Sequence, residues 1–475
     1  MKDNKKSLSV YTAWYSVGNF IIRSISFLLL PLYSNLLSTT EFGDYALLVS
    51  MYSIIAVLYQ SGMQNALTKY YLENENQVQR KKIFSSIFNS IVISGILLTC
   101  LSIIFSKGIS QLILGTQHDS KLISIIFIAL FFETLSFFPL HLLKTKEKAR
   151  KVVTYSSVSA VINLLLNVVF VYKMRMDIEG IFIAQMLSSL ALTIIVFPSV
   201  LPEIQMYIDK VLLKKMFLFS LPFVVSGLFS SAVDVSDRFI LNIFTSKDEV
   251  GIYTLSYKIA MIMNVFVISF RTAWIPRALN VYNSQNYSVI FGNTLKKLTS
   301  VSLTILLCIT LFSPYLFHIR LFGVTILNKN FEPGLVILPY ILLGYFFSGL
   351  AIFYSLFPFI SSKSYYFLYS DLIAFVVNIL LNFILIPLVG MVGAAIATTL
   401  AYFASALFLF FISRRKINIT YPIKNLSTII ISCLVLLIIG MNLKNLLVDV
   451  VIIIIYLTLI VRLSKISLAG LFSIT

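Results

Sequence analysis

Long apolar runs, separated by short polar segments, occupy almost the whole chain. A helix needs roughly 20 apolar residues to cross a bilayer core about 30 Å thick. Windows of this kind fall at residues 11–37, 45–67, 83–105, 122–143, 152–172, 180–200, 216–244, 252–276, 298–319, 335–357, 365–388, 392–412, 426–441 and 446–463. The pattern therefore predicts an all-α integral membrane protein with about 14 transmembrane helices.

Composition supports the same class of protein. Hydrophobic residues make up 59% of the 475 residues and charged residues only 12%, against about 25% charged residues in soluble domains. A water-soluble fold could not bury so much apolar surface, because surface area grows with chain size. The formal net charge of +18 does not indicate a nucleic-acid partner, because the cations lie mainly in the short segments between apolar runs.

The distribution of these cations predicts the orientation of the chain. Of the 37 lysines and arginines, 24 lie at the termini or in the connections after even-numbered spans, 8 lie in the other connections and 5 lie inside spans. Cytoplasmic loops of membrane proteins carry the excess of positive charge. We therefore expect both termini in the cytoplasm and residues 106–121 on the opposite side of the membrane.

Two pairs of segments resemble each other at a nearly constant separation. Residues 35–45 resemble residues 242–253 about 208 positions later, and residues 163–167 resemble residues 378–382, 215 positions later. Each pair falls on equivalent spans if the repeated unit contains six helices. A duplication is therefore a better explanation than chance similarity between apolar helices.

The repeat predicts the domain organisation. We expect a six-helix bundle at residues 1–205, a second at residues 206–415, and two appended helices at residues 416–475. Because six is even, both copies enter the membrane in the same direction, and parallel repeats of this kind usually hold the substrate between them. The expected architecture is two six-helix bundles around a central cavity.

Three groups of motifs resemble those of a known family. They are Glu41-x-Gly43-x-Tyr45 after a first span that contains Pro31, Pro222 followed by Ser236-Asp237-Arg238, and Asn378-x3-Asn382-x3-Ile386-Pro387-x2-Gly390-x2-Gly393-Ala394-Ala395-Ile396-Ala397-Thr398. Over roughly residues 8–415 the chain resembles the polysaccharide transporters of the MOP (multidrug/oligosaccharidyl-lipid/polysaccharide) superfamily. Within it, the chain is most similar to the Wzx-type O-antigen and capsule repeat-unit flippases.

The resemblance implies a function and its partners. Such a protein flips an undecaprenyl-diphosphate-linked oligosaccharide from the cytoplasmic to the outer leaflet of a bacterial inner membrane, for O-antigen, lipopolysaccharide or capsule biosynthesis. Its implied partners are this polyprenyl-diphosphate-linked oligosaccharide, membrane lipids, a polysaccharide polymerase and chain-length proteins. Two alternatives stay open, a drug or cation antiporter of the same superfamily and a flippase of peptidoglycan lipid precursors.

An enzyme is a weaker alternative. A membrane polymerase or ligase would need a long extracytoplasmic loop to hold donor and acceptor, and the connections are short. The sequence also carries no Gly-rich phosphate loop with Lys, no nucleophile elbow and no paired zinc ligands. We expect a transporter without enzyme activity, cofactor or metal site.

Ionisable groups inside a bilayer are costly and usually face a cavity or a partner. Arg23 shares one polar face of the first span with Ser16, Asn19 and Ser26. This stripe would line a cavity or form a buried packing network. We expect Arg23 to contact the substrate diphosphate, because the forked donors of arginine suit phosphate.

Span seven carries Asp234, Asp237 and Arg238. Asp234 and Arg238 are spaced for an ion pair within the helix, and a substrate contact is the alternative. Asp237 would then be left to pair with Lys258 or Arg271 of span eight.

In span eight, Tyr257, Asn264 and Arg271 recur every seven residues and share a helix face, whereas Lys258 points elsewhere. Both cations of this span could also reach the membrane interface. The expected substrate-cavity residues are Arg23, Arg238, Arg271, Lys258, Asn19 and Asn264.

Four carboxylates lie within the first twelve spans. Glu133 sits mid-span and could accept a proton in a coupled cycle or balance Arg23. Asp371 shares a stripe with Asn378 and Asn382 near the cytoplasmic rim. The residues expected to serve coupling or charge balance are Glu133, Asp234, Asp237 and Asp371.

Overall fold

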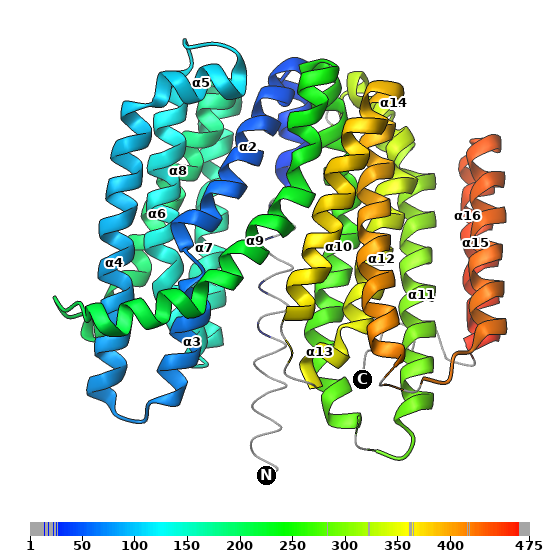
Figure 1. Ribbon diagram of the computed structural model, residues 1–475. Helices are drawn as coiled ribbons and strands as arrows, with labels where there is room; N and C mark the ends of the chain where they lie inside the picture. Colours follow the sequence, from blue (N-terminus) through cyan, green and yellow to red (C-terminus); the bar gives the residue numbers. More distant parts are fainter. Residues whose placement is uncertain are drawn as a thin grey trace. The chain divides into compact units, whose positions relative to one another are not determined.

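The computed structural model describes residues 14, 18, 22, 25, 27–282, 284–321, 324–360, 363, 365–415, 417 and 419–464 (Figure 1). In this part of the chain, twelve helices are long and apolar enough to cross a membrane. Two predicted spans, 365–388 and 392–412, share one helical run, and the first predicted span is represented by the shorter apolar helix Phe27–Leu36. The prediction of an all-α membrane protein is confirmed.

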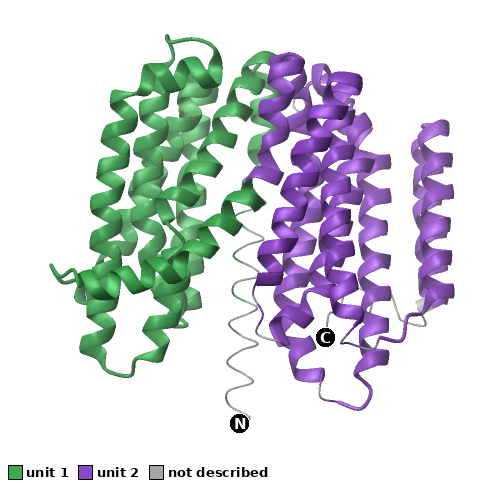
Figure 2. Ribbon diagram, in the orientation of Figure 1, with its two compact units in different colours: residues 1–231 green, residues 232–475 purple. Residues whose placement is uncertain are grey.

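The chain divides into two compact units, residues 1–231 and residues 232–475 (Figure 2). After the helix Phe27–Leu36, unit 1 contains α2 (Thr39–Gln60), α3 (Met63–Glu73), α4 (Gln77–Ile104), α5 (Ser106–Leu114), α6 (Ser120–Thr145), α7 (Ala149–Asn167), the π-helical turn η1 (Val168–Lys173), α8 (Asp177–Val196), and the short turns η2 (Phe197–Ser199) and η3 (Leu201–Glu203). Helix α9 (Lys210–Phe244) begins in unit 1 and ends in unit 2.

Unit 2 continues with α10 (Lys247–Val281), α11 (Tyr287–Phe312), η4 (Ser313–Phe317), the antiparallel pair β1 (Arg320–Leu321) and β2 (Val324–Thr325), η5 (Lys329–Ile337), α12 (Leu338–Tyr354), α13 (Leu356–Ile360), α14 (Tyr365–Arg414), α15 (Ile423–Leu443) and α16 (Leu446–Ser464). The strands are two residues each, so helices determine the architecture of this unit as well.

The two repeated sequence segments form equivalent helix starts. Ser38 caps α2: its side chain accepts the Glu41 N–H at 3.2 Å, and the Glu41 carboxylate accepts the Ser38 N–H at 2.8 Å. This reciprocal capping box satisfies backbone donors that have no partner within the helix. In unit 2, the Ser246 side chain accepts the Glu249 N–H at 3.3 Å at the start of α10.

Helix α14 is an antiparallel hairpin of two helices. Gly390, with φ 56° and ψ −134°, interrupts the helical backbone. On either side of this reversal, Ser370 Oγ lies 2.7 Å from Ser405 Oγ, and Asn378 Nδ2 donates to Thr398 Oγ1 at 3.2 Å. These contacts pair the first half of α14 with the second, as expected for the eleventh and twelfth predicted spans.

The helices pack in the same order within each unit. In unit 1, α6 packs against α2, α4 and α8. In unit 2, α12 packs against α10, α11 and α14, and Thr399 in the second half of α14 donates to the Tyr340 carbonyl oxygen of α12 at 2.6 Å. The fourth helix of each set of six therefore contacts the second, third and sixth. This agreement supports the six-helix repeat, and superposition of the two units stays a prediction.

A break in the second span packs against α9. Ser61 and Gly62 adopt left-handed backbone angles, with φ of 48° and 62°, and separate α2 from α3. A Cβ at Gly62 would lie 2.9 Å from the Ser220 carbonyl oxygen, two residues before Pro222 inside α9. Only glycine allows the backbones to approach this closely.

The appended helices α15 and α16 pack against each other and against α11. The buried Cys433 thiol lies 3.8 Å from the Leu303 carbonyl oxygen of α11, and Tyr315 OH donates to the buried Asp449 carboxylate at 2.7 Å. These two helices therefore pack onto α11 of unit 2.

Candidate functional site

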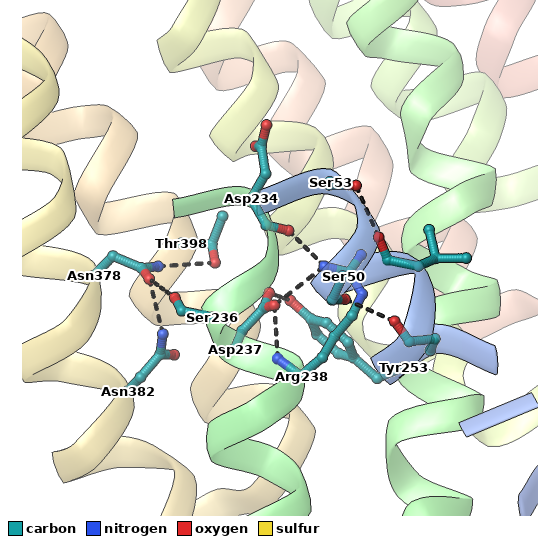
Figure 3. Close-up of polar contacts among 12 residues, drawn as sticks. Ser50, Ser53, Asp234, Ser236, Asp237, Arg238, Tyr253, Asn378, Asn382 and Thr398 are labelled. Atoms are coloured by element: carbon teal, nitrogen blue, oxygen red, sulfur yellow. Dashed lines mark hydrogen bonds and ion pairs between the residues drawn. The ribbon is translucent and has the colours of Figure 1, made fainter. Parts of the chain in front are cut away.

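Two charged residues of α9, Asp237 and Arg238, form an ion pair buried in unit 2. Asp237 Oδ1 lies 3.3 Å from Arg238 Nη1, and the two residues are 0% and 7% exposed. Arg238 Nη1 also donates to the main-chain oxygen of Asp234 at 2.5 Å. Figure 3 shows these three residues together on α9. The guanidinium therefore wraps back onto its own helix.

Tyrosines from other helices bind the two carboxylates. Tyr253 of α10 donates its hydroxyl to Asp237 Oδ2, and Tyr402 of α14 donates to Asp234 Oδ1 at 2.5 Å. Hydrogen bonds to an ionised acceptor are about twice as strong as neutral ones. These two bonds therefore connect α9 to α10 and to the second half of α14.

An aromatic ring covers the Arg238 guanidinium. The guanidinium carbon of Arg238 lies 4.7 Å from the centre of the buried Tyr257 ring, which is cation–π geometry. We call Asp234, Asp237, Arg238, Tyr253, Tyr257 and Tyr402 the Arg238 cluster. It contains one more carboxylate than cations, so the charge of Arg238 is already balanced inside the protein. The arrangement stabilises the helix packing, because breaking a buried ion pair leaves an uncompensated charge.

A second polar cluster lies beside it in unit 2. Asn378 Oδ1 accepts from Ser236 Oγ at 2.9 Å and from Asn382 Nδ2 at 2.9 Å, and Asn378 Nδ2 donates to Thr398 (Figure 3). Both asparagines are fully buried. The cluster joins α9 to both halves of α14. Among the described residues, Asn382 Oδ1 is buried without a hydrogen-bond partner.

Unit 1 holds a separate network around Glu133 of α6. Tyr52 of α2 donates its hydroxyl to Glu133 Oε2, and Gln185 Nε2 of α8 donates to the same oxygen at 3.3 Å. Gln185 Oε1 in turn accepts from Asn163 Nδ2 of α7 at 3.2 Å. The half-buried Glu133 is the acceptor on which these bonds converge.

The same network continues along α7. Asn167 Nδ2 donates to Asn163 Oδ1 at 3.1 Å, and Tyr33 OH donates to Asn167 Oδ1 at 2.7 Å. The asparagine pair of unit 1 thus joins the fifth helix of the unit to its first and sixth helices. Asn378 and Asn382 make the equivalent connection in unit 2, so the repeated Asn-x3-Asn motif has the same packing role in both units.

The two predicted cavity cations of span eight, Lys258 and Arg271, differ in their exposure. Arg271 is exposed on α10, whereas Lys258 and Asn264 of the same helix are half-buried. Asp237 pairs with the neighbouring arginine of its own helix, not with either of these cations. Arg23 and Asn19 lie outside the described residues.

The ion pair that spacing along the helix predicts, between Asp234 and Arg238, is not the one that forms. Arg238 pairs with Asp237, because the Asp234 carboxylate accepts a hydrogen bond from Tyr402, and Arg238 bonds only the main-chain oxygen of Asp234.

The fourth predicted carboxylate, Asp371, is half-buried. In the part of the chain that the structure describes, no three His, Cys, Asp or Glu side chains are grouped to hold a metal ion.

Sequence reasoning missed the uncharged partners of the buried acids. Tyr52, Gln185 and Tyr402 come from helices far along the chain from the carboxylates that they bind. Tyr253 lies in the repeated segment 242–253, and its hydrogen bond to Asp237 was not predicted. The buried acids themselves indicate that such partners exist, because a carboxylate within a membrane span requires hydrogen-bond donors from neighbouring helices.

Comparison with known proteins identifies the family. A family model described as polysaccharide biosynthesis protein matches residues 11–280, more than half of the chain. No curated protein matches the sequence.

Three solved structures show the same fold. The lipid II flippase MurJ in an inward closed conformation has a TM-score of 0.77 at 18% identity and covers 95% of this chain and 99% of its own. An inward-facing multidrug resistance MATE family transporter of the MOP superfamily has a TM-score of 0.70 at 15% identity, covering 83% and 94%. A MOP superfamily transporter from Pyrococcus furiosus has a TM-score of 0.64 at 14% identity, covering 87% and 95%.

The fold is therefore that of multi-pass membrane transporters, including transporters of the MOP superfamily, and the matched family model agrees with the resemblance to polysaccharide transporters. This chain belongs to the polysaccharide biosynthesis protein family.

Proposed function

We propose that the protein flips a polyprenyl-diphosphate-linked oligosaccharide, such as an undecaprenyl-linked O-antigen or capsule repeat unit, from the cytoplasmic to the outer leaflet. One observation carries the proposal: a chain of the polysaccharide biosynthesis family shares its fold, over 95% of its length, with a lipid II flippase. A polysaccharide biosynthesis protein built as a membrane transporter needs a saccharide cargo that is itself held in the membrane. A lipid-linked oligosaccharide fits this requirement.

The proposed location follows from the cargo and the charge distribution. We place the protein in a bacterial inner membrane with both termini in the cytoplasm, because the cation-rich connections belong on that side. A polysaccharide polymerase and chain-length proteins would use the flipped product. The protein itself acts as a transporter, not as an enzyme.

Arg271 and Arg23 are the proposed contacts for the substrate diphosphate. A diphosphate that leaves water needs cations to replace its hydration, and arginine presents paired donors. Arg271 is exposed, and the ion pairs found among the described residues involve other cations. Arg238 is the weaker candidate, because Asp237 balances its charge and Tyr257 covers it.

Two alternative cargoes are supported by the structural comparisons. The likeness to a multidrug resistance transporter favours a small cationic drug, and the likeness to a lipid II flippase favours a peptidoglycan precursor. The three cargoes share a fold, so only a transport assay separates them.

The test is complementation in three bacterial strains, one without its O-antigen flippase, one depleted of its lipid II flippase and one without its drug exporters. We expect the protein to restore surface polysaccharide in the first strain only. Rescue of growth in the second strain or of drug resistance in the third, without surface polysaccharide in the first, would overturn the proposal.

Variants then test the diphosphate contact. Arg271→Ala should reduce surface polysaccharide about tenfold at equal membrane abundance, since loss of a charge-assisted contact costs about 1.5 kcal/mol or more. Arg271→Lys should retain part of the activity. Thr272→Ala is the matched control, because this neighbouring exposed residue carries no charge. Normal export by Arg271→Ala would remove Arg271 from the site, and Arg23→Ala would then carry the test.

A further inference from the structure

We propose that Glu133 is a proton-binding site in unit 1, with the carboxyl group taking up and releasing one proton during transport. Proton binding is a property of this site alone. Its link to transport rests on the proposed function. The proposal is carried by the hydrogen-bond geometry around the carboxylate, by the absence of a compensating cation in the described part of the chain, and by the mid-helix position of Glu133.

Glu133 is placed where a fixed charge is expensive. It lies near the middle of the 26-residue α6, a helix long and apolar enough to span a membrane. The ion pairs within 4.0 Å found among the described residues join other groups, so two neutral donors, Tyr52 and Gln185, stabilise the ionised form here. An ion in this environment is costly without a counter-charge. Uptake of one proton removes that cost.

The partners of Glu133 suit a proton better than a metal ion. Tyr52 and Gln185 both present donors to Oε2. The side-chain oxygen of Gln185 is turned away and accepts from Asn163. A bound Na⁺ or Mg²⁺ would need several oxygen ligands facing it. The groups around Glu133 Oε2 are hydrogen-bond donors, and the donated hydrogens cannot coordinate a cation.

Among the described residues, no ion pair within 4.0 Å involves Glu133. The helices packed against α6 are α2, α3, α4, α5, α7 and α8, and from these Tyr52 faces the carboxylate. On these helices, Tyr59 bonds Thr99 and His141 bonds Thr68. The other Asp, Glu, Lys and Arg residues of these seven helices lie within the first or last two turns.

The hydrogen bonds give the proton a mechanical consequence. From Tyr33 through Asn167, Asn163 and Gln185, each side chain donates to the next, and the last donates to Glu133. Successive bonds in such a chain polarise one another. When the carboxylate is neutralised, its two charge-assisted bonds weaken and the carboxyl group becomes a donor. The packing of the helix Phe27–Leu36, α2, α6, α7 and α8 therefore depends on one proton.

The direct test is infrared difference spectroscopy of the purified full-length protein in lipid nanodiscs. A protonated carboxyl group gives its own C=O band, so the band is followed as a function of pH, without any substrate. We expect a titrating band in the wild-type protein and its loss in Glu133→Gln. Glu179→Gln is the matched control, because Glu179 forms an exposed ion pair with Lys121 at 2.6 Å; this variant should keep the band.

Tyr52→Phe gives a second, independent readout. It removes one donor to the carboxylate and keeps the ring. A hydrogen bond to a charged group contributes about 1.5 to 3 kcal/mol, so the midpoint of the titration should move to higher pH by about 1 to 2 pH units. If Glu133→Gln fails to accumulate, wild-type protein with ¹³C-labelled glutamate carboxyls assigns the band to glutamate, and Tyr52→Phe assigns it to Glu133.

The outcomes separate this inference from the proposed function. A band that is absent from the wild-type protein, persists in Glu133→Gln or fails to move in Tyr52→Phe overturns the proton site. Reconstituted vesicles with a polyprenyl-diphosphate oligosaccharide and an imposed pH gradient then test coupling. Gradient-dependent flipping that Glu133→Gln abolishes supports it, and flipping that Glu133→Gln leaves unchanged overturns it. A titrating band in a protein that flips no oligosaccharide would contradict the proposed function and leave the proton site standing.

Discussion

Replacing Gly390 with alanine should destabilise the hairpin of α14 through one identifiable contact. Gly390 has a φ of 56°, and a Cβ at this position would lie 2.3 Å from Glu249 Oε1. The same carboxylate oxygen accepts the backbone N–H of Met391 at 2.6 Å. The Glu249 side chain from the start of α10 therefore occupies the space that an alanine methyl would need, and it must move if the methyl is added.

The expected cost has two parts. A non-glycine residue at these backbone angles costs about 1 to 3 kcal/mol. Losing the hydrogen bond between Met391 and the carboxylate costs about 1.5 to 3 kcal/mol. Because Glu249 is half-buried, water compensates part of the second amount. We expect Gly390→Ala to lower the free energy of unfolding by about 2 to 4 kcal/mol.

The assay compares thermal stability of the full-length variants in detergent, measured as the temperature at which half of the monodisperse protein is lost. Two other glycines provide matched controls. Gly115 also has a positive φ, 75°, but a Cβ there meets nothing within 4 Å, so Gly115→Ala measures backbone strain alone. Gly108 lies in α5 with open space and a helical backbone, so Gly108→Ala should be neutral or slightly stabilising. Stability should increase from Gly390→Ala through Gly115→Ala to Gly108→Ala.

A double-mutant cycle isolates the contact itself. In a Glu249→Ala background the obstructing carboxylate is absent, so Gly390→Ala should cost only about 1 to 3 kcal/mol of backbone strain. The two substitutions should therefore be clearly non-additive. Additive effects, or a Gly390→Ala variant no less stable than Gly115→Ala, would refute the reasoning from the 2.3 Å approach.

Two further predictions concern the buried ion pair and the topology. Asp237→Ala leaves Arg238 buried without its ion-pair partner and should lower the free energy of unfolding by about 3 to 5 kcal/mol, which would be measured as a loss of the protein from membrane extracts. Adding Arg238→Met should restore much of the abundance. No restoration would show that the Asp237 carboxylate matters apart from this pair. Reporter fusions at Thr116 and Gln285 should give opposite signals, external and internal respectively, and matching signals would contradict the predicted orientation.

The amino-acid sequence alone predicted the membrane class, the approximate positions of the spans and the six-helix repeat. These follow from local properties, because the bilayer thickness fixes the length of each apolar run. The helix starts at Ser38 and Ser246 are also local, since a cap depends on residues within one turn. The reversal at Gly390 was visible as a short break between two apolar runs.

The tertiary structure decided which polar side chains meet. Spacing along α9 favoured an ion pair between Asp234 and Arg238. Tyr402, which lies 168 residues after Asp234 in the sequence, instead donates to the Asp234 carboxylate, and Arg238 pairs with Asp237. Glu133 likewise receives its hydrogen bond from Tyr52, 81 residues away. Apolar length is read from one helix at a time, whereas such partners depend on how several helices rotate and pack, and the apolar pattern of a single membrane helix does not encode that rotation.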